Sequence, residues 1–168
     1  TVIGNCIQNE SINVDDLTTF DLEYLFIKLR SRSVNNIIEI SYRDDEGETY
    51  QIEIDLDQVS LTDDPEHSKK VKVTEDLGII LKYPSPNMID KMEGVKTELE
   101  LFFAMVRHCI EQVYDSSKVY KAKDYTSEEL EEFIQTLDVN TFKHIQKFFD
   151  TMPHLYYKAD YMTKDGIQ

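Results

Sequence analysis

FDLEYLFIKLRSRSVNNIIEISY, residues 20–42, is the stretch of sequence that decides the fold. Apolar side chains cover more than one face of its first half, which is typical of a helix packed on several sides. At residues 35–36 the apolar period changes from 3.6 to 2, and Ile38, Ile40 and Tyr42 then share one face. The stretch therefore predicts a helix that leads directly into a strand, at the centre of an α+β domain.

Strands are expected to continue this pattern as far as residue 83. The second of them alternates cleanly between apolar and polar residues, which is typical of an antiparallel sheet with one buried and one solvated face. A glycine in the loop before it, Gly47, suits a bulged turn. The sequence thus predicts an antiparallel meander of about four strands, at residues 37–43, 49–56, 70–74 and 78–83.

The rest of the chain is expected to be mostly helical, giving about four to five helices packed with the sheet. Helical spacing and capping residues place these helices at 19–32, 97–115, 128–137 and 141–151, with a short helix or connector at 87–96 and a loop at 116–125. Residues 154–161 read as a strand, and Asp165-Gly166 as the turn of a C-terminal hairpin. We expect residues 1–168 to form a single α+β domain that is truncated at both ends, because the sequence starts without Met inside an apolar piece and little chain remains for the returning strand.

The charge is strongly acidic, with 33 acidic against 18 basic side chains and a net charge of −15. Such a surface repels phosphate groups, which argues against a nucleic-acid partner or an anionic membrane surface. Two interpretations of the acidity stay open: it keeps the protein soluble, or it meets basic partners. No apolar run reaches the length of about 18 residues that a transmembrane helix requires.

A search for catalytic chemistry identifies no candidate. The four histidines lack the spacing of a chelating pair, Cys109 lies among apolar positions of an expected helix, and phosphate-binding and nucleophile motifs are absent from the sequence. The carboxylate clusters at 44–46 and 128–132 fall in a turn and in a first helical turn, where acidic residues have local reasons to occur. We therefore predict no catalytic, cofactor-binding or metal-binding residues.

Partner binding is the remaining kind of function, and two groups of residues are candidates for it. One is a basic cluster at the end of the first expected helix, in an otherwise acidic chain; its alternative role is to complement the helix dipole. The other is a set of tyrosines around the 116–125 loop and near the C-terminal end, of a type enriched in interfaces, whose alternative role is local packing. The candidates are Lys28, Arg30, Arg32, Tyr120, Tyr125 and Tyr156.

Three segments together resemble the base plate protein family of T-even-type phages with contractile tails. They are FDLEYLFIKLRSRSVNNIIEI at 20–40, VYKAKDYTSEELEEFIQTL at 119–137 and FKHIQKFFDTMPHLYYK at 142–158, in that family's order. The resemblance implies a subunit of the baseplate hub, or a factor needed to assemble it. It supplies no catalytic residues.

Three hypotheses follow from the resemblance and the residues. The first is a non-enzymatic structural component of the baseplate hub, assembled in the host cytoplasm and retained in the virion tail, where it contacts other tail proteins within a larger oligomer. The second is a chaperone that assembles the hub or the tape-measure protein and is absent from the mature virion. The third, a minor alternative, is a tail-associated hydrolase. None of the three requires a cofactor, a nucleic acid or a membrane.

Overall fold

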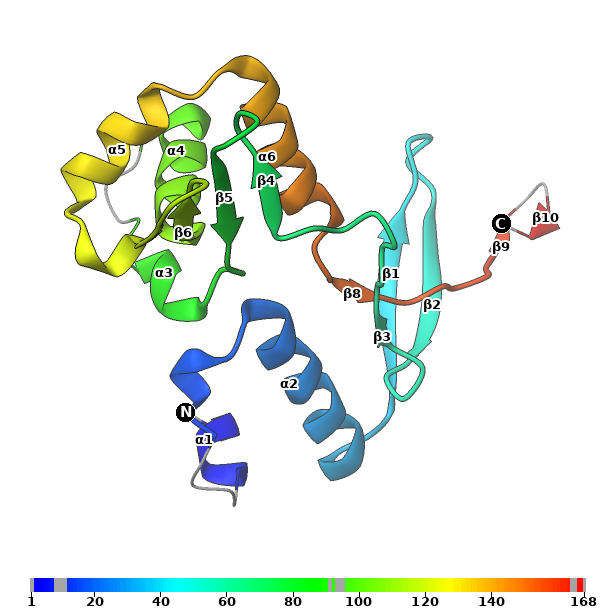
Figure 1. Cartoon of the computed structure of the whole chain (residues 1–168). Helices are drawn as coiled ribbons and strands as arrows, with labels where there is room; N and C mark the ends of the chain where they lie inside the picture. Colours follow the sequence, from blue (N-terminus) through cyan, green and yellow to red (C-terminus); the bar gives the residue numbers. More distant parts are fainter. Residues whose placement is uncertain (1, 8–11, 91, 93–95, 164–165, 168) are drawn as a thin grey trace. The chain divides into compact units, whose positions relative to one another are not determined.

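The computed structural model describes residues 2–7, 12–90, 92, 96–163 and 166–167 (Figure 1). Its contacts divide the chain into two units. The first comprises Thr1–Val14, Phe20–Thr62 and Pro153–Gln168, and the second comprises Asp15–Thr19 and Asp63–Met152. Helices and antiparallel sheets occur in both units, so the predicted α+β class is confirmed. The expectation of a single domain over residues 1–168 stays a prediction.

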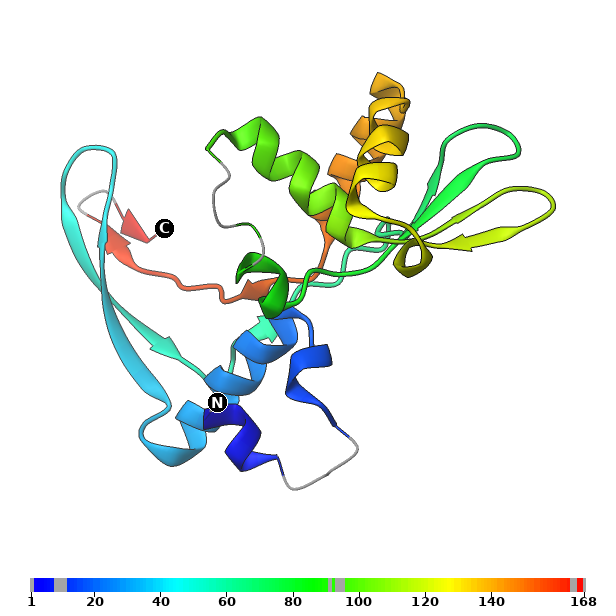
Figure 2. The ribbon, with the colours of Figure 1, turned by 90° about the vertical axis from the view of Figure 1, so that its left-hand side faces the viewer.

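The second unit is built on a four-stranded antiparallel sheet in the order β4-β5-β6-β7. Its strands are β4 Lys70–Lys72, β5 Gly78–Leu81, β6 Ile110–Tyr114 and β7 Val119–Lys121. Ile79 lies opposite Val71 on one side and Val113 on the other, so three apolar residues cross the sheet side by side. The β4–β5 and β6–β7 hairpins extend next to each other in Figure 2.

Among the described residues, four α-helices belong to the same unit as this sheet. They are α3 Pro86–Asp90, α4 Glu98–Cys109, α5 Ser127–Gln135 and α6 Val139–Thr151, with a 3₁₀ turn, η2, at Ala122–Asp124. Thr97 and Thr126 form capping boxes at the starts of α4 and α5, and the Asp138 side chain caps α6, which satisfies backbone N–H groups that helix starts leave unpaired. Helix α6 packs on β4, and α4 packs on α5 (Figure 1).

The core of the second unit lies between the sheet and these helices. Apolar side chains from every layer meet there and exclude water, and burying each of them stabilises the fold by about 1.5–3 kcal/mol. The buried residues of this core are Val71, Ile79, Leu81, Met88, Val106, Cys109, Ile110, Ile134, Leu137, Ile145 and Phe148.

The first unit combines helices with a long β-hairpin and shorter strands. Its helices are α1 Val2–Cys6 and α2 Thr19–Ser33, of which Thr19 is assigned to the second unit; the 3₁₀ turn η1 Val14–Asp16 also crosses the division. Its strands are β1 Ile37–Arg43, β2 Thr49–Asp55, β3 Ser60–Leu61, β8 Leu155–Tyr156, β9 Met162–Thr163 and β10 Gly166–Ile167. Three antiparallel pairs form from these strands: β1 with β2, β3 with β8, and β9 with β10.

The β1–β2 hairpin confirms the expected bulged turn. Gly47 has a φ of +89°, a left-handed conformation that a residue with a Cβ rarely adopts. The Gly47 amide donates to the carbonyl of Asp44 at 3.1 Å, and the Asp44 amide donates to the carbonyl of Glu48 at 3.0 Å. The ring of Tyr161 then lies against the hairpin, with its centroid 5.6 Å from that of Tyr42.

The predicted grouping of strands is wrong. The four strands expected at residues 37–83 are present, but the first two pair only with each other among the described residues, and the last two join the four-stranded sheet. The other two strands of that four-stranded sheet, β6 and β7, come from residues predicted as helix and loop. The helix expected at 97–115 ends at Cys109, and Ile110 takes an extended conformation with a ψ of 119°. Apolar spacing continues across this point, so periodicity alone did not reveal the change to a strand.

The prediction that the first helix is packed on several sides is also wrong. Helix α2 begins near the expected position, but only Phe20 of its residues is buried, and Phe26 is 51% exposed. At the C-terminal end, the strand expected at 154–161 is limited to β8, whose pairing with β3 covers only Leu155 and Tyr156; beyond it the Asp55 amide donates to the Tyr157 hydroxyl at 3.3 Å. The expected C-terminal hairpin is present as β9 and β10, but Gly166, predicted as part of its turn, is paired in β10, and Asp165 lies outside the described residues.

Candidate functional site

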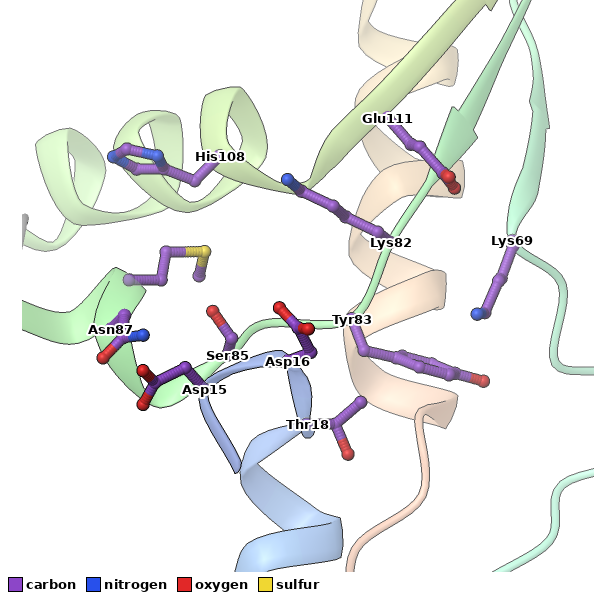
Figure 3. A pocket seen from close by; sticks show the side chains of 11 residues that line it. Asp15, Asp16, Thr18, Lys69, Lys82, Tyr83, Ser85, Asn87, His108 and Glu111 are labelled. Carbon is purple, nitrogen blue, oxygen red and sulfur yellow. The ribbon is translucent and has the colours of Figure 1, made fainter. Parts of the chain in front are cut away.

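The second unit contains an open polar pocket of about 410 Å³. Its lining comes from η1 and the residue before α2, the residue before β4, the segment after β5, α3, α4 and β6, which Figure 3 shows around one space. The lining residues are Asp15, Asp16, Thr18, Lys69, Lys82, Tyr83, Ser85, Asn87, Met88, His108 and Glu111.

Backbone hydrogen bonds hold the walls of this pocket in place. The Thr19 amide donates to the carbonyl of Pro84 at 3.1 Å, which ties the segment that carries the aspartates to the end of β5. The Lys82 amide donates to the carbonyl of Cys109 at 2.7 Å, which joins β5 to the end of α4. The Lys69 ammonium lies 4.1 Å from the centre of the Tyr83 ring, a distance at which a cation is attracted to the ring face.

The chemistry of this pocket suits salt bridges with a protein surface. Three carboxylates, from Asp15, Asp16 and Glu111, share the space with the ammonium groups of Lys69 and Lys82. Small-molecule sites are mostly apolar clefts that enclose the ligand, whereas charges of both signs line this open pocket. Sequence reasoning missed the pocket, because its residues come from four separate segments and carry no motif.

His67 contacts Tyr83 of this pocket and has a structural role. One ring nitrogen, Nδ1, lies 2.9 Å from the Thr151 hydroxyl, and the other, Nε2, lies 2.9 Å from the Tyr83 hydroxyl. Its ring also stacks on Tyr83 with centroids 5.5 Å apart, and burial lowers the pKa of the imidazole. The residue thus joins the β4 region to α6. Over the part of the chain that the structure describes, no group of three His, Cys, Asp or Glu residues is arranged to hold a metal ion.

Cys109 is buried in the core, as the sequence predicts for a core thiol. Burial raises the pKa of its thiol to about 12, so the thiolate that a nucleophile requires is scarce at neutral pH.

Within the described residues, no helix is both long enough and apolar enough to cross a bilayer.

The predicted basic cluster divides into two kinds of residue. The Lys28 ammonium donates to three backbone carbonyls, those of Leu56, Asp57 and Val59, at 3.2, 2.8 and 3.0 Å. Arg30 is exposed, and the side chain of Arg32 is 81% exposed, with its guanidinium 4.0 Å from the Asp57 carboxylate. Lys28 therefore holds the turn after β2 in place, while the two arginines present their charge to solvent.

The predicted tyrosines lie in two places. Tyr120 and Tyr125 are brought together by β7 and η2, with ring centroids 6.5 Å apart. Tyr156, on β8, is 50% exposed and belongs to the other unit. Their role in partner binding stays a prediction.

Comparison with protein families identifies the family of this chain. A family model described as "T4 bacteriophage base plate protein" matches residues 1–166, nearly the whole chain. Comparison with curated proteins and with solved structures found no match.

Proposed function

The chain belongs to the T4 bacteriophage base plate protein family, and on this premise we propose that it is a non-enzymatic structural component of the baseplate hub. It acts through contacts with other tail proteins during tail assembly and stays in the virion. The observation that carries the proposal is the extent of the family match, which runs through both units rather than through one of them.

Exposed apolar side chains support a role based on contacts. Large hydrophobic residues on a surface are typical of protein–protein interaction sites when they gather in patches. In the first unit, α2 and the β1–β2 hairpin carry several of them, namely Leu25, Phe26, Ile37, Ile40 and Tyr42. In this proposal these side chains, together with Arg30, Arg32 and Tyr156, face neighbouring hub or baseplate subunits.

A second candidate function is an assembly chaperone that holds a hub or tape-measure protein and then leaves. The net charge of −15 favours it, since a strongly acidic protein keeps a basic or aggregation-prone partner soluble. The polar pocket, with charges of both signs, suits a reversible contact of this kind.

Quantitative mass spectrometry of purified phage particles tests the proposal. Isotope-labelled peptides of this chain and of a known baseplate subunit are added to mature virions and to hub subassemblies isolated from infected cells. Retention in mature virions at a fixed ratio to the baseplate subunit is the expected result. Presence in the subassemblies with absence from mature virions would establish the chaperone instead, and absence from both would refute either role.

A further inference from the structure

A second opening in the second unit, a groove of about 270 Å³, differs in character from the polar pocket. It lies where β6, β7 and η2 meet α5, and its walls are apolar and aromatic. Six of the residues that line it are Val113, Tyr120, Ala122, Tyr125, Leu130 and Phe133, and the one charged residue among its lining is Glu129.

The groove is held open by contacts that do not involve its interior. The Tyr120 hydroxyl donates to the Asp115 carboxylate at 2.9 Å, which fixes the ring on β7. The Tyr125 amide donates to the carbonyl of Ala122 at 3.2 Å, which places the second ring at the end of η2. Ala122, whose side chain is small, lies between the two tyrosines in the sequence and lines the groove with them. A binding site that is already ordered loses less entropy when a ligand binds.

Packing supports the floor of the groove. Val113, Ala122 and Phe133 are partly buried and pack against the core of the second unit. Tyr125 is 41% exposed, so its ring is accessible to a partner. The groove thus combines a rigid floor with an accessible aromatic wall, the surroundings in which an apolar anchor residue of a partner contributes most to binding.

The charges beside the groove define what suits it. Helix α5 carries four carboxylates and no basic residue, from Glu128, Glu129, Glu131 and Glu132. A hydrogen bond from its own backbone amide, followed by one from the Thr126 side chain, lowers the pKa of Glu128, so its charge persists at mildly acidic pH. On the opposite side the Lys118 ammonium lies 4.9 Å from the centre of the Tyr120 ring. The groove therefore has an acidic side at α5, while Lys118 and Asp115 place charges of both signs beside the Tyr120 ring.

We propose that this groove receives a segment of another tail protein in which a bulky apolar side chain is followed by lysine or arginine. The apolar side chain occupies the groove and lies against Tyr125 and Leu130, and the basic residues lie along α5. The inference rests on the proposed function, because it names the surface and the partner chemistry through which a hub component would act. Opposite charges at the rim favour this partner over an acidic segment of the same apolarity.

The test measures binding of the full chain to defined peptides by fluorescence anisotropy. The probe is a short fluorescein-labelled peptide with one tryptophan beside lysines; one comparison peptide has alanine in place of tryptophan, and another has glutamates in place of the lysines. We expect the probe to bind at least about tenfold more tightly than either comparison peptide, a difference of about 1.4 kcal/mol. Equal binding of the three peptides, or no binding of the probe, would overturn the inference.

Substitutions locate the binding. Tyr125→Ser shortens the aromatic wall, and Glu132→Lys reverses a charge on α5 without touching the capping box or the Arg107–Glu131 ion pair. Each is expected to weaken probe binding about tenfold. The matched controls are Val139→Ser, at an apolar residue that is 71% exposed on α6, and Glu75→Lys, at an exposed residue of the β4–β5 turn. Binding that falls equally in the controls would place the site elsewhere.

Failure of this inference is distinguishable from failure of the proposed function. If a phage that carries Tyr125→Ser and Glu132→Lys together still incorporates the chain into virions at the normal ratio, the groove is not the contact surface, while the hub role stands. If the unaltered chain is absent from virions and from hub subassemblies, the hub role fails whatever the peptides show. Circular dichroism of each variant confirms that the fold is retained, and a variant that unfolds is replaced by Tyr125→Leu.

Discussion

Replacing Lys28 with methionine should destabilise the first unit by about 2 kcal/mol. The change keeps the length and apolarity of the side chain and removes the ammonium that three backbone carbonyls share. Two of these carbonyls belong to the buried residues Leu56 and Val59, and leaving a buried acceptor without its donor costs about 1–3 kcal/mol. Asp57 is exposed, so water replaces the ammonium at its carbonyl at little cost. We use the lower limit for each buried acceptor because the site lies close to solvent.

The assay is native-state amide hydrogen exchange, because it reports on each unit separately. The amide of Leu56 donates to the carbonyl of Asn36 at 2.7 Å and so belongs to the structure that Lys28 stabilises. A loss of about 2 kcal/mol makes this amide exchange about thirtyfold faster. Amides of α6, such as that of Ile145, should keep their protection, since they belong to the other unit.

Arg30→Met is the matched control, since it removes a positive charge from an exposed position of the same helix. A surface change of this kind is expected to alter stability by no more than about 0.5 kcal/mol. An unchanged exchange rate at Leu56 in Lys28→Met, or the same acceleration in Arg30→Met, would refute the reasoning, because either result would show that the ammonium does not stabilise the turn.

Three further predictions concern the second unit. Gly78→Ala should destabilise the sheet by about 1–3 kcal/mol, because the new Cβ would lie 2.4 Å from the Tyr114 ring, and Tyr114→Ala should remove most of that cost in a double-mutant cycle measured by urea denaturation. Cys109 should resist thiol reagents at pH 8 in the folded chain and react in denaturant, as counted by mass spectrometry, since burial raises its pKa to about 12. Asp115 should titrate near pH 2 by carboxyl NMR. A hydrogen bond from the Ser117 side chain lowers its pKa from 3.8, and further hydrogen bonds, including one from the Tyr120 hydroxyl, lower it more. Its contribution to stability is therefore present above pH 3.8 and lost as the pH falls toward 2, and Tyr120→Phe should raise the titration midpoint.

Local signals in the sequence predicted the parts of the fold that depend on local physics. Helices α4, α5 and α6 begin within two residues of the expected starts, because a capping side chain acts on amides two or three residues away. Gly47 marks its turn for the same reason, since the requirement for a positive φ is a property of one residue. The α+β class follows from such signals together.

The strand pairing could not be predicted in this way, because it depends on residues far apart in the chain. Residues 110–114 continue the apolar spacing of the preceding helix, and only their pairing with β5 and β7 makes them a strand. The two-unit division has the same origin: residues 15–19 join a unit whose other members begin at residue 63. No local pattern in those five residues indicates which core they accompany.

Lys28 shows how the same limit affects the candidate site. In the sequence it belongs to a basic cluster with Arg30 and Arg32, and nothing there distinguishes the three charges as candidate partner contacts. In the structure the Lys28 ammonium is occupied by backbone carbonyls that lie 28–31 residues further along the chain. Reversing all three charges would therefore mix a loss of stability with a loss of binding. Charge reversal at Arg30 and Arg32 alone is the change that reports on hub assembly, because the turn after β2 then keeps its ammonium.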